Sequence, residues 1–164
     1  MTEFESRRKG TKTVAWVILI ALVVGIGGGW LLNVVFGGDD GSGTPASVYV
    51  TTANGGSLLK DGDTTLLTLT AVGNTIVKVD TATKAAVPQD AAEFFTAWND
   101  TFGDEPRNAV VTGTTPDGDV QLVLTLTDAT FSEIGYVAEF TAEVVSGRPE
   151  VRDLTDVTLV IDAD

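Results

Sequence analysis

Residues 120–127 read Val-Gln-Leu-Val-Leu-Thr-Leu-Thr, and every even-numbered position before Thr127 carries an apolar side chain. Successive side chains of a β-strand point to opposite faces, so a period of two predicts a strand with one face in the core. The same period recurs in residues 136–145 and 156–162. The carboxyl-terminal part of the chain is therefore predicted to form half-buried strands.

Four shorter runs rich in β-branched residues extend this pattern toward the amino terminus: 48–52, 64–71, 75–80 and 108–112. They are punctuated by turn-forming sequences, namely Asn54-Gly55, Asp61-Gly62, Gly73-Asn74 and Pro116-Asp117-Gly118. Strands and turns at this spacing predict an all-β domain, an antiparallel β-sandwich that is Ig-like in architecture.

One segment departs from the period of two. Asp90 is followed three residues later by Glu93, which is the pattern of a helix capping box, and Gly103 is a helix-ending residue. The apolar face of this run holds Phe94, Phe95 and Trp98. We expect one short inserted helix, and aromatic residues at this spacing favour a place in the core over a ligand pocket.

An uncharged stretch of 24 residues, 13–36, precedes the predicted β-domain. At about 1.5 Å rise per residue a helix of this length covers about 36 Å, enough to cross a hydrocarbon core of about 30 Å. Basic residues, Arg7, Arg8, Lys9 and Lys12, lie before it, and Asp39 and Asp40 follow it. Because basic residues are retained on the cytoplasmic side, the sequence predicts a single-pass plasma-membrane protein with its amino terminus inside.

Four regions follow from this topology: a basic cytoplasmic tail at 1–12, a transmembrane helix at 13–36, a flexible linker at 37–47 and an extracytoplasmic β-domain at 48–164. The linker assignment rests on the Gly, Ser and Asp content of Gly37 to Ser47. An alternative is a pilin-like leader cut after Gly10, although Ala15 stands where many pilins carry a glutamate. Processing there would make the protein an envelope structural protein.

Charge and composition limit the classes of molecule that the protein can bind and the class of protein to which it belongs. The chain carries 10 basic and 23 acidic residues, and residues 1–12 hold four of the basic and two of the acidic ones. The remainder therefore has six basic against 21 acidic residues, or −15, which repels nucleic acid. The absence of cysteine excludes a disulfide scaffold and favours a prokaryotic cell-envelope protein.

The chain also lacks histidine, and this removes most site chemistry. Without His and Cys there is no Ser-His-Asp or Cys-His nucleophile, no histidine-ligated zinc and no haem or iron–sulfur ligation of the usual kinds. No phosphate-binding glycine motif follows a predicted strand. We therefore expect no cofactor and no enzymatic activity.

Paired carboxylates provide the one candidate metal site. Asp61 and Asp63 flank Gly62, and Asp117 and Asp119 flank Gly118. Oxygen ligands of this type suit Ca²⁺, which makes a divalent-cation or small-ligand binding module an alternative function. Asp-Gly is also a frequent hairpin turn sequence, and the turn is the favoured interpretation.

Within the predicted span, Gly25 and Gly29 have the spacing that lets two membrane helices approach closely. This predicts contact with a second copy or with a larger integral membrane protein. The bilayer itself is the other expected partner.

Several short motifs between residues 64 and 162 occur in a characteristic order. They are Thr75-Ile76 with Asp80 after it, the helix containing Trp98, the run Asp104-Glu105-Pro106-Arg107-Asn108-Ala109, and the ending Thr158-Leu159-Val160-Ile161-Asp162. This order resembles a family of small secreted or surface-anchored β-proteins with D-x-P-x-N-A and L-F-I-D motifs. The matching positions here are Asp80, Pro106, Asn108 and Asp162.

Two positions depart from that family pattern. Thr81-Ala82 stand where an Arg-Pro pair is usual, and Val160 replaces a Phe. The resemblance implies export and a β-fold, and the family has no assigned activity. Together these observations predict a membrane-anchored, non-enzymatic accessory or binding subunit at the cell surface.

Overall fold

The computed structural model describes residues 46–163 of the chain. The predicted tail, the predicted span with Gly25 and Gly29, and nearly all of the predicted linker lie outside these residues. The part described belongs to one compact unit that begins at Pro45. Within it, no helix has both the length and the apolar character needed to cross a membrane.

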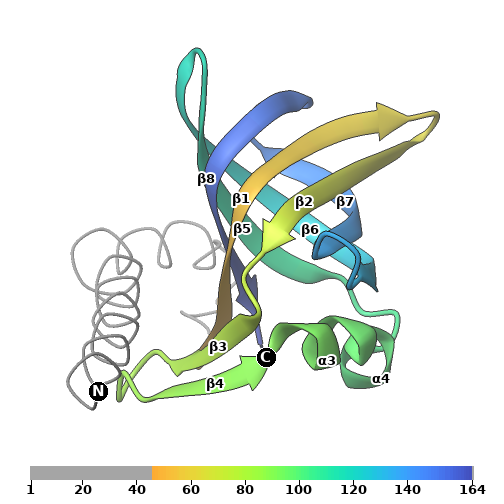
Figure 1. The fold of residues 1–164 in the computed structure, drawn as a ribbon. Coiled ribbons are helices and arrows are strands. Elements are labelled where there is room, and N and C mark those ends of the chain that lie inside the picture. The colour runs from red at the N-terminus through yellow and green to blue at the C-terminus, as the bar shows by residue number, and fades with distance from the viewer. Residues whose placement is uncertain (1–45, 164) are drawn as a thin grey trace, which may run out of the picture. The chain divides into compact units, whose positions relative to one another are not determined.

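Eight strands and two short helices make up this unit (Figure 1). The strands are β1 (Ser47–Asp61), β2 (Thr64–Val72), β3 (Thr75–Asp80), β4 (Ala86–Asp90), β5 (Arg107–Thr115), β6 (Gly118–Ser132), β7 (Val137–Ser146) and β8 (Val151–Asp162). The helices are α3 (Ala91–Thr96) and α4 (Trp98–Phe102). The predicted all-β, antiparallel class is confirmed.

The strands form one continuous sheet, in the order β2-β7-β6-β5-β8-β1-β3-β4, and β2 pairs with β1 as well. That additional pairing closes six strands into a ring, from which the β3–β4 hairpin extends. The sandwich expected from the sequence has two separate sheets, whereas here the opposite sides of one closed sheet enclose the core. Periodicity reports which face of a strand is buried, but it does not report which strands pair.

Closure depends on the length of β1. Its first residues pair with β3 and its later residues pair with β2 along the same edge, while β8 pairs with its other edge. The turn predicted at Asn54-Gly55 is wrong, because both residues lie inside this strand. The other three predicted turns are confirmed, since each falls between two strands or at the start of one.

Glycine allows the ring to close tightly at this point. A Cβ atom on Gly56 would lie 3.0 Å from the carbonyl oxygen of Thr68 and 3.0 Å from a methyl carbon of Leu69. A Cβ on Gly55 would lie 2.8 Å from the hydroxyl oxygen of Thr70. The two glycines therefore interrupt no strand, and instead make room for β2 against β1.

The core fills the inside of the ring. Its members include Leu122, Leu124 and Leu126, which are fully buried as their alternation predicts. The helices α3 and α4 lie at one end of the ring (Figure 1), where they contact β6. Phe95 and Trp98 of these helices contact Phe140 of β7 at that end.

The predicted helix forms as two short ones separated by Ala97. Its predicted start is confirmed, because the Asp90 carboxylate accepts a hydrogen bond from the Glu93 backbone N–H at 2.9 Å. Gly103 ends α4 and donates its N–H to the carbonyl oxygen of Asn99. The aromatic residues on the predicted apolar face are buried, so their assignment to the core is confirmed.

A row of valines crosses five strands on the face of the sheet turned away from this core. Strand register places these residues next to one another in the order Val77, Val50, Val160, Val110 and Val123. The first four are buried, although they do not belong to the core cluster. The alternation in the sequence does not reveal this second apolar face, because it assigns Val123 and Val160 to the polar side.

Candidate functional site

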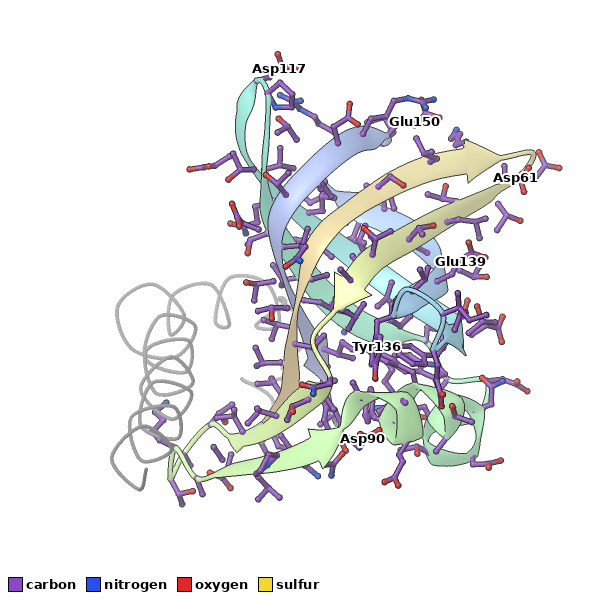
Figure 2. All side chains as sticks on the ribbon, in the orientation of Figure 1. Asp61, Asp90, Asp117, Tyr136, Glu139 and Glu150 are labelled. Atoms are coloured by element: carbon purple, nitrogen blue, oxygen red, sulfur yellow. The ribbon has the colours of Figure 1, made fainter. Side chains whose placement is uncertain are left out.

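The candidate cation loops are both hairpin turns. Asp61 and Asp63 lie at the β1–β2 turn, where Gly62 adopts a φ of +63°, a conformation that glycine tolerates. Figure 2 shows Asp61 and Asp117 at the tips of different hairpins, so the two loops do not combine. Among residues 46–163 no cluster of three or more acidic side chains could hold a metal ion.

The carboxylates of the β5–β6 turn have separate partners. Asp119 accepts a hydrogen bond from the Thr114 hydroxyl at 3.1 Å. Asp117 lies 3.9 Å from a guanidinium nitrogen of Arg148, and its backbone N–H donates to the Thr115 hydroxyl. These contacts are those of a turn, and cation binding by either loop stays a prediction.

Asp80, one of the four family-motif residues, organises the turn after β3. Its carboxylate accepts hydrogen bonds from the backbone N–H groups of Thr83 at 2.6 Å and Ala82 at 3.0 Å. The Thr83 hydrogen bonds, with smaller contributions from Ala82 and the charge of Lys84, hold the pKa of this carboxyl below its ordinary value of 3.8. Thr81, which stands at the family's Arg position, donates its N–H and its hydroxyl to the Ala46 carbonyl.

Three of the motif residues gather where β1 begins. Asp80 pairs with Ser47, and Asp162 pairs with Val48. Asn108 immediately precedes Ala109, which pairs with Ile161, so the register places Asn108 beside Asp162. The fourth, Pro106, lies in the loop before β5. This arrangement ties four strands together and brings no catalytic pair into contact.

Arg107, next to Pro106, attaches that loop to α4. Its guanidinium carbon lies 4.6 Å from the centre of the Phe102 ring, and a guanidinium nitrogen lies 3.1 Å from the Glu105 carboxylate. A cation over an aromatic face contributes about 0.5–1 kcal/mol at a partly exposed position. These contacts hold the loop against the ring of Phe102.

A hollow between β4 and the two helices is the candidate binding site. It has a volume of about 660 Å³. Its lining combines aromatic, small and acidic residues: Tyr49, Pro88, Gln89, Asp90, Glu93, Phe94, Ala97 and Thr101. In the described part of the chain, hollows of about 470, 500 and 320 Å³ are lined by no aromatic residue. We call the hollow of about 660 Å³ the β4–α3 groove.

The floor of the β4–α3 groove is aromatic and closely packed. The rings of Tyr49 and Phe94 lie 4.5 Å apart between centroids, and both side chains also contact Phe102. Each is 7% exposed, so most of each ring is already packed. A ligand here would meet the edges of a preformed surface.

The rim of the groove is acidic. Asp90 and Glu93 lie on it, and none of its lining residues is basic. The basic residue that contacts the groove wall is Lys78, whose Nζ lies 5.5 Å from the centre of the Tyr49 ring. Figure 2 shows Asp90 where β4 meets α3, at the helix end of the ring.

The strand that borders the groove is an edge strand. In residues 46–163, β4 pairs with β3 alone. The carbonyl oxygen of Ala85 accepts a hydrogen bond from the Asp80 N–H, and the N–H of Ala91 donates one to the Asn74 carbonyl oxygen. Strand alternation therefore turns the backbone groups of Ala86 and Pro88 outward, whereas the carbonyl oxygen of Asp90, the N-cap residue, accepts the first hydrogen bond of α3. Pro88 has no N–H, so it presents an acceptor without a donor.

The β4–α3 groove was not predicted from the sequence. Residues 86–90 read Ala-Val-Pro-Gln-Asp, which has neither strand alternation nor a known motif. Asp90 and Glu93 are identified in the sequence only as a helix start. The one available signal is a proline beside a predicted strand, which is typical of an edge.

No protein-family model matches the chain, and no curated protein or solved structure is significantly similar to it. The fold and the site therefore define the class: an all-β, antiparallel domain closed into a ring, with an acidic groove beside an edge strand. Membership of the family of surface-anchored β-proteins stays a prediction.

Proposed function

We propose that this protein is a single-pass membrane protein whose extracytoplasmic β-domain is an accessory or binding subunit without enzymatic activity. The observation that carries the anchor is the uncharged stretch 13–36 with four basic residues directly before it. The observation that carries binding is the β4–α3 groove. The chemistry of the chain supports a non-enzymatic role, because the sequence has neither histidine nor cysteine.

The expected partner is a larger integral membrane protein or a second copy of the chain, contacted through Gly25 and Gly29 and through the β-domain. An acidic domain held about 11 linker residues from the bilayer stays close to proteins in the same membrane, because such a linker reaches about 18 Å. Tethering of this kind raises the effective concentration of a membrane partner.

Affinity purification from native membranes in mild detergent tests the proposal. We expect a stoichiometric membrane protein, or a dimer of the chain, to co-purify with the tagged full-length protein. A matched control replaces residues 13–36 with an unrelated apolar span of the same length. Recovery of the protein alone as a monomer would contradict a subunit role.

The alternative of a processed leader gives a different mature chain. We expect intact-mass measurement to find Gly10 and the residues before it, apart from removal of Met1. A mature chain that begins at Thr11 would instead support the envelope structural protein.

A further inference from the structure

We propose that the β4–α3 groove binds an extended peptide segment that carries basic side chains next to a small apolar one. This inference rests on the proposed binding function and names the chemistry of the partner. The occupant is a segment of another protein, because the groove combines an open strand edge with an apolar floor and an acidic rim.

The shape of the groove fits a short peptide. Its volume of about 660 Å³ lies in the range of ligand sites, about 300–1,000 Å³. Tyr49 and Phe94 supply an apolar floor, while Pro88 and Ala97 supply small apolar walls. One medium-sized apolar side chain can rest on this floor without displacing either ring.

The charge of the rim selects a basic segment. The Asp90 carboxylate accepts from the Glu93 N–H, and the Glu93 side chain also lines the groove. An arginine or lysine of the partner can meet both carboxylates, and the nearby cation is Lys78, whose Nζ lies 5.5 Å from the centre of the Tyr49 ring. An acidic segment would be repelled by these two carboxylates and by the net negative charge of the domain.

The strand edge limits how a partner segment can pair with it. Ala86 and Pro88 direct their carbonyl oxygens outward, and Pro88 has no N–H to donate. A partner strand cannot form a complete ladder here, which reduces unspecific strand pairing. The carbonyl oxygens of Ala86 and Pro88 can accept from the backbone of a partner segment or from a donor-rich side chain such as arginine.

The test uses the full-length protein in phosphatidylcholine nanodiscs and the labelled peptide acetyl-Gly-Arg-Val-Arg-Gly-amide. Binding is followed by fluorescence anisotropy, with empty nanodiscs as the blank, and the site is mapped by amide chemical shifts. We expect saturable binding with shifts confined to residues 86–101 and the segment around Tyr49. The peptide acetyl-Gly-Glu-Val-Glu-Gly-amide should not bind.

Paired variants distinguish binding in the groove from attraction to the overall negative charge of the domain. Glu93→Gln keeps the hydrogen bond from the backbone N–H of residue 93 to the Asp90 carboxylate. It should weaken binding about two- to fivefold, which corresponds to the loss of a partly exposed ion pair. Glu139→Gln removes the same charge on β7 and should have a smaller effect. Thr101→Arg places a cation in the groove and should weaken binding at least tenfold, whereas Thr130→Arg on β6 should not.

Equal weakening by the two glutamine variants, or shifts spread over the whole sheet, would overturn the proposal. Absence of binding by the basic peptide would also overturn it. The subunit role is measured separately by co-purification, so a partner recovered in membranes without peptide binding would contradict this inference alone.

Discussion

The indole ring of Trp98 lies 5.5 Å from the ring of Phe140, centroid to centroid, with the two planes at 70°. Trp98 begins α4, and Phe140 lies in the middle of β7. This edge-to-face contact joins the inserted helices to the inside of the ring. It also shows that the aromatic residues there belong to the core, with Trp98 only 1% exposed.

Trp98→Ala should therefore lower the free energy of unfolding of fragment 45–164 by about 3–5 kcal/mol, because it empties a buried aromatic position. Trp98→Phe should cost less. Denaturation followed by circular dichroism measures both. A near-native unfolding free energy for the alanine variant would contradict the core assignment.

Gly56→Ala should destabilise the same fragment by about 1–3 kcal/mol, because the new Cβ would lie 3.0 Å from a backbone oxygen of β2. Gly73→Ala is the matched control, since its Cβ would make only ordinary contacts of 3.5 Å or more. Thermal melts compare the two variants. If Gly56→Ala were as stable as Gly73→Ala, the proposed crowding between β1 and β2 would be wrong.

Asp80 makes stability depend on pH in one direction. Its pKa is lowered in the folded state, so its stabilising contribution is present above the unfolded value and is lost as pH falls through the folded value. Asp80→Asn should thus melt at a lower temperature than the native fragment at pH 6. The difference should shrink as pH falls below 3.8. A difference that stays constant down to pH 2 would mean that the carboxylate charge has no such role.

The strands with a clean period of two could be predicted from the sequence, and the reason is visible in Leu122 and Leu124. Each faces the core, and the residue before each, Gln121 or Val123, points to the other face of the sheet. Ring closure could not be predicted, because Asn54-Gly55 is typical of a turn, whereas in the structure it lies inside β1 beside β2. The β4–α3 groove could not be predicted either, because its lining comes from segments that are separate in the sequence, namely β1, β4 and both helices.

Calcium should have no specific effect on the two Asp-Gly-Asp turns. Millimolar Ca²⁺ should raise the melting temperature of the fragment no more than NaCl of matched ionic strength, because both screen the acidic surface. A real site would add stability by RT ln(1 + [L]/Kd). A calcium-specific rise of several degrees that disappears with Asp117→Asn and Asp119→Asn together would show that the β5–β6 loop binds the ion.

The orientation of the β-domain relative to the membrane is the central claim, and single-cysteine labelling tests it directly. The native chain has no cysteine, so Glu133→Cys in the β6–β7 turn and Thr2→Cys each introduce one reporter. In intact protoplasts a membrane-impermeant maleimide should label Glu133→Cys at once and should label Thr2→Cys only after lysis. Protection of Glu133→Cys until the cells are lysed would contradict an extracytoplasmic domain.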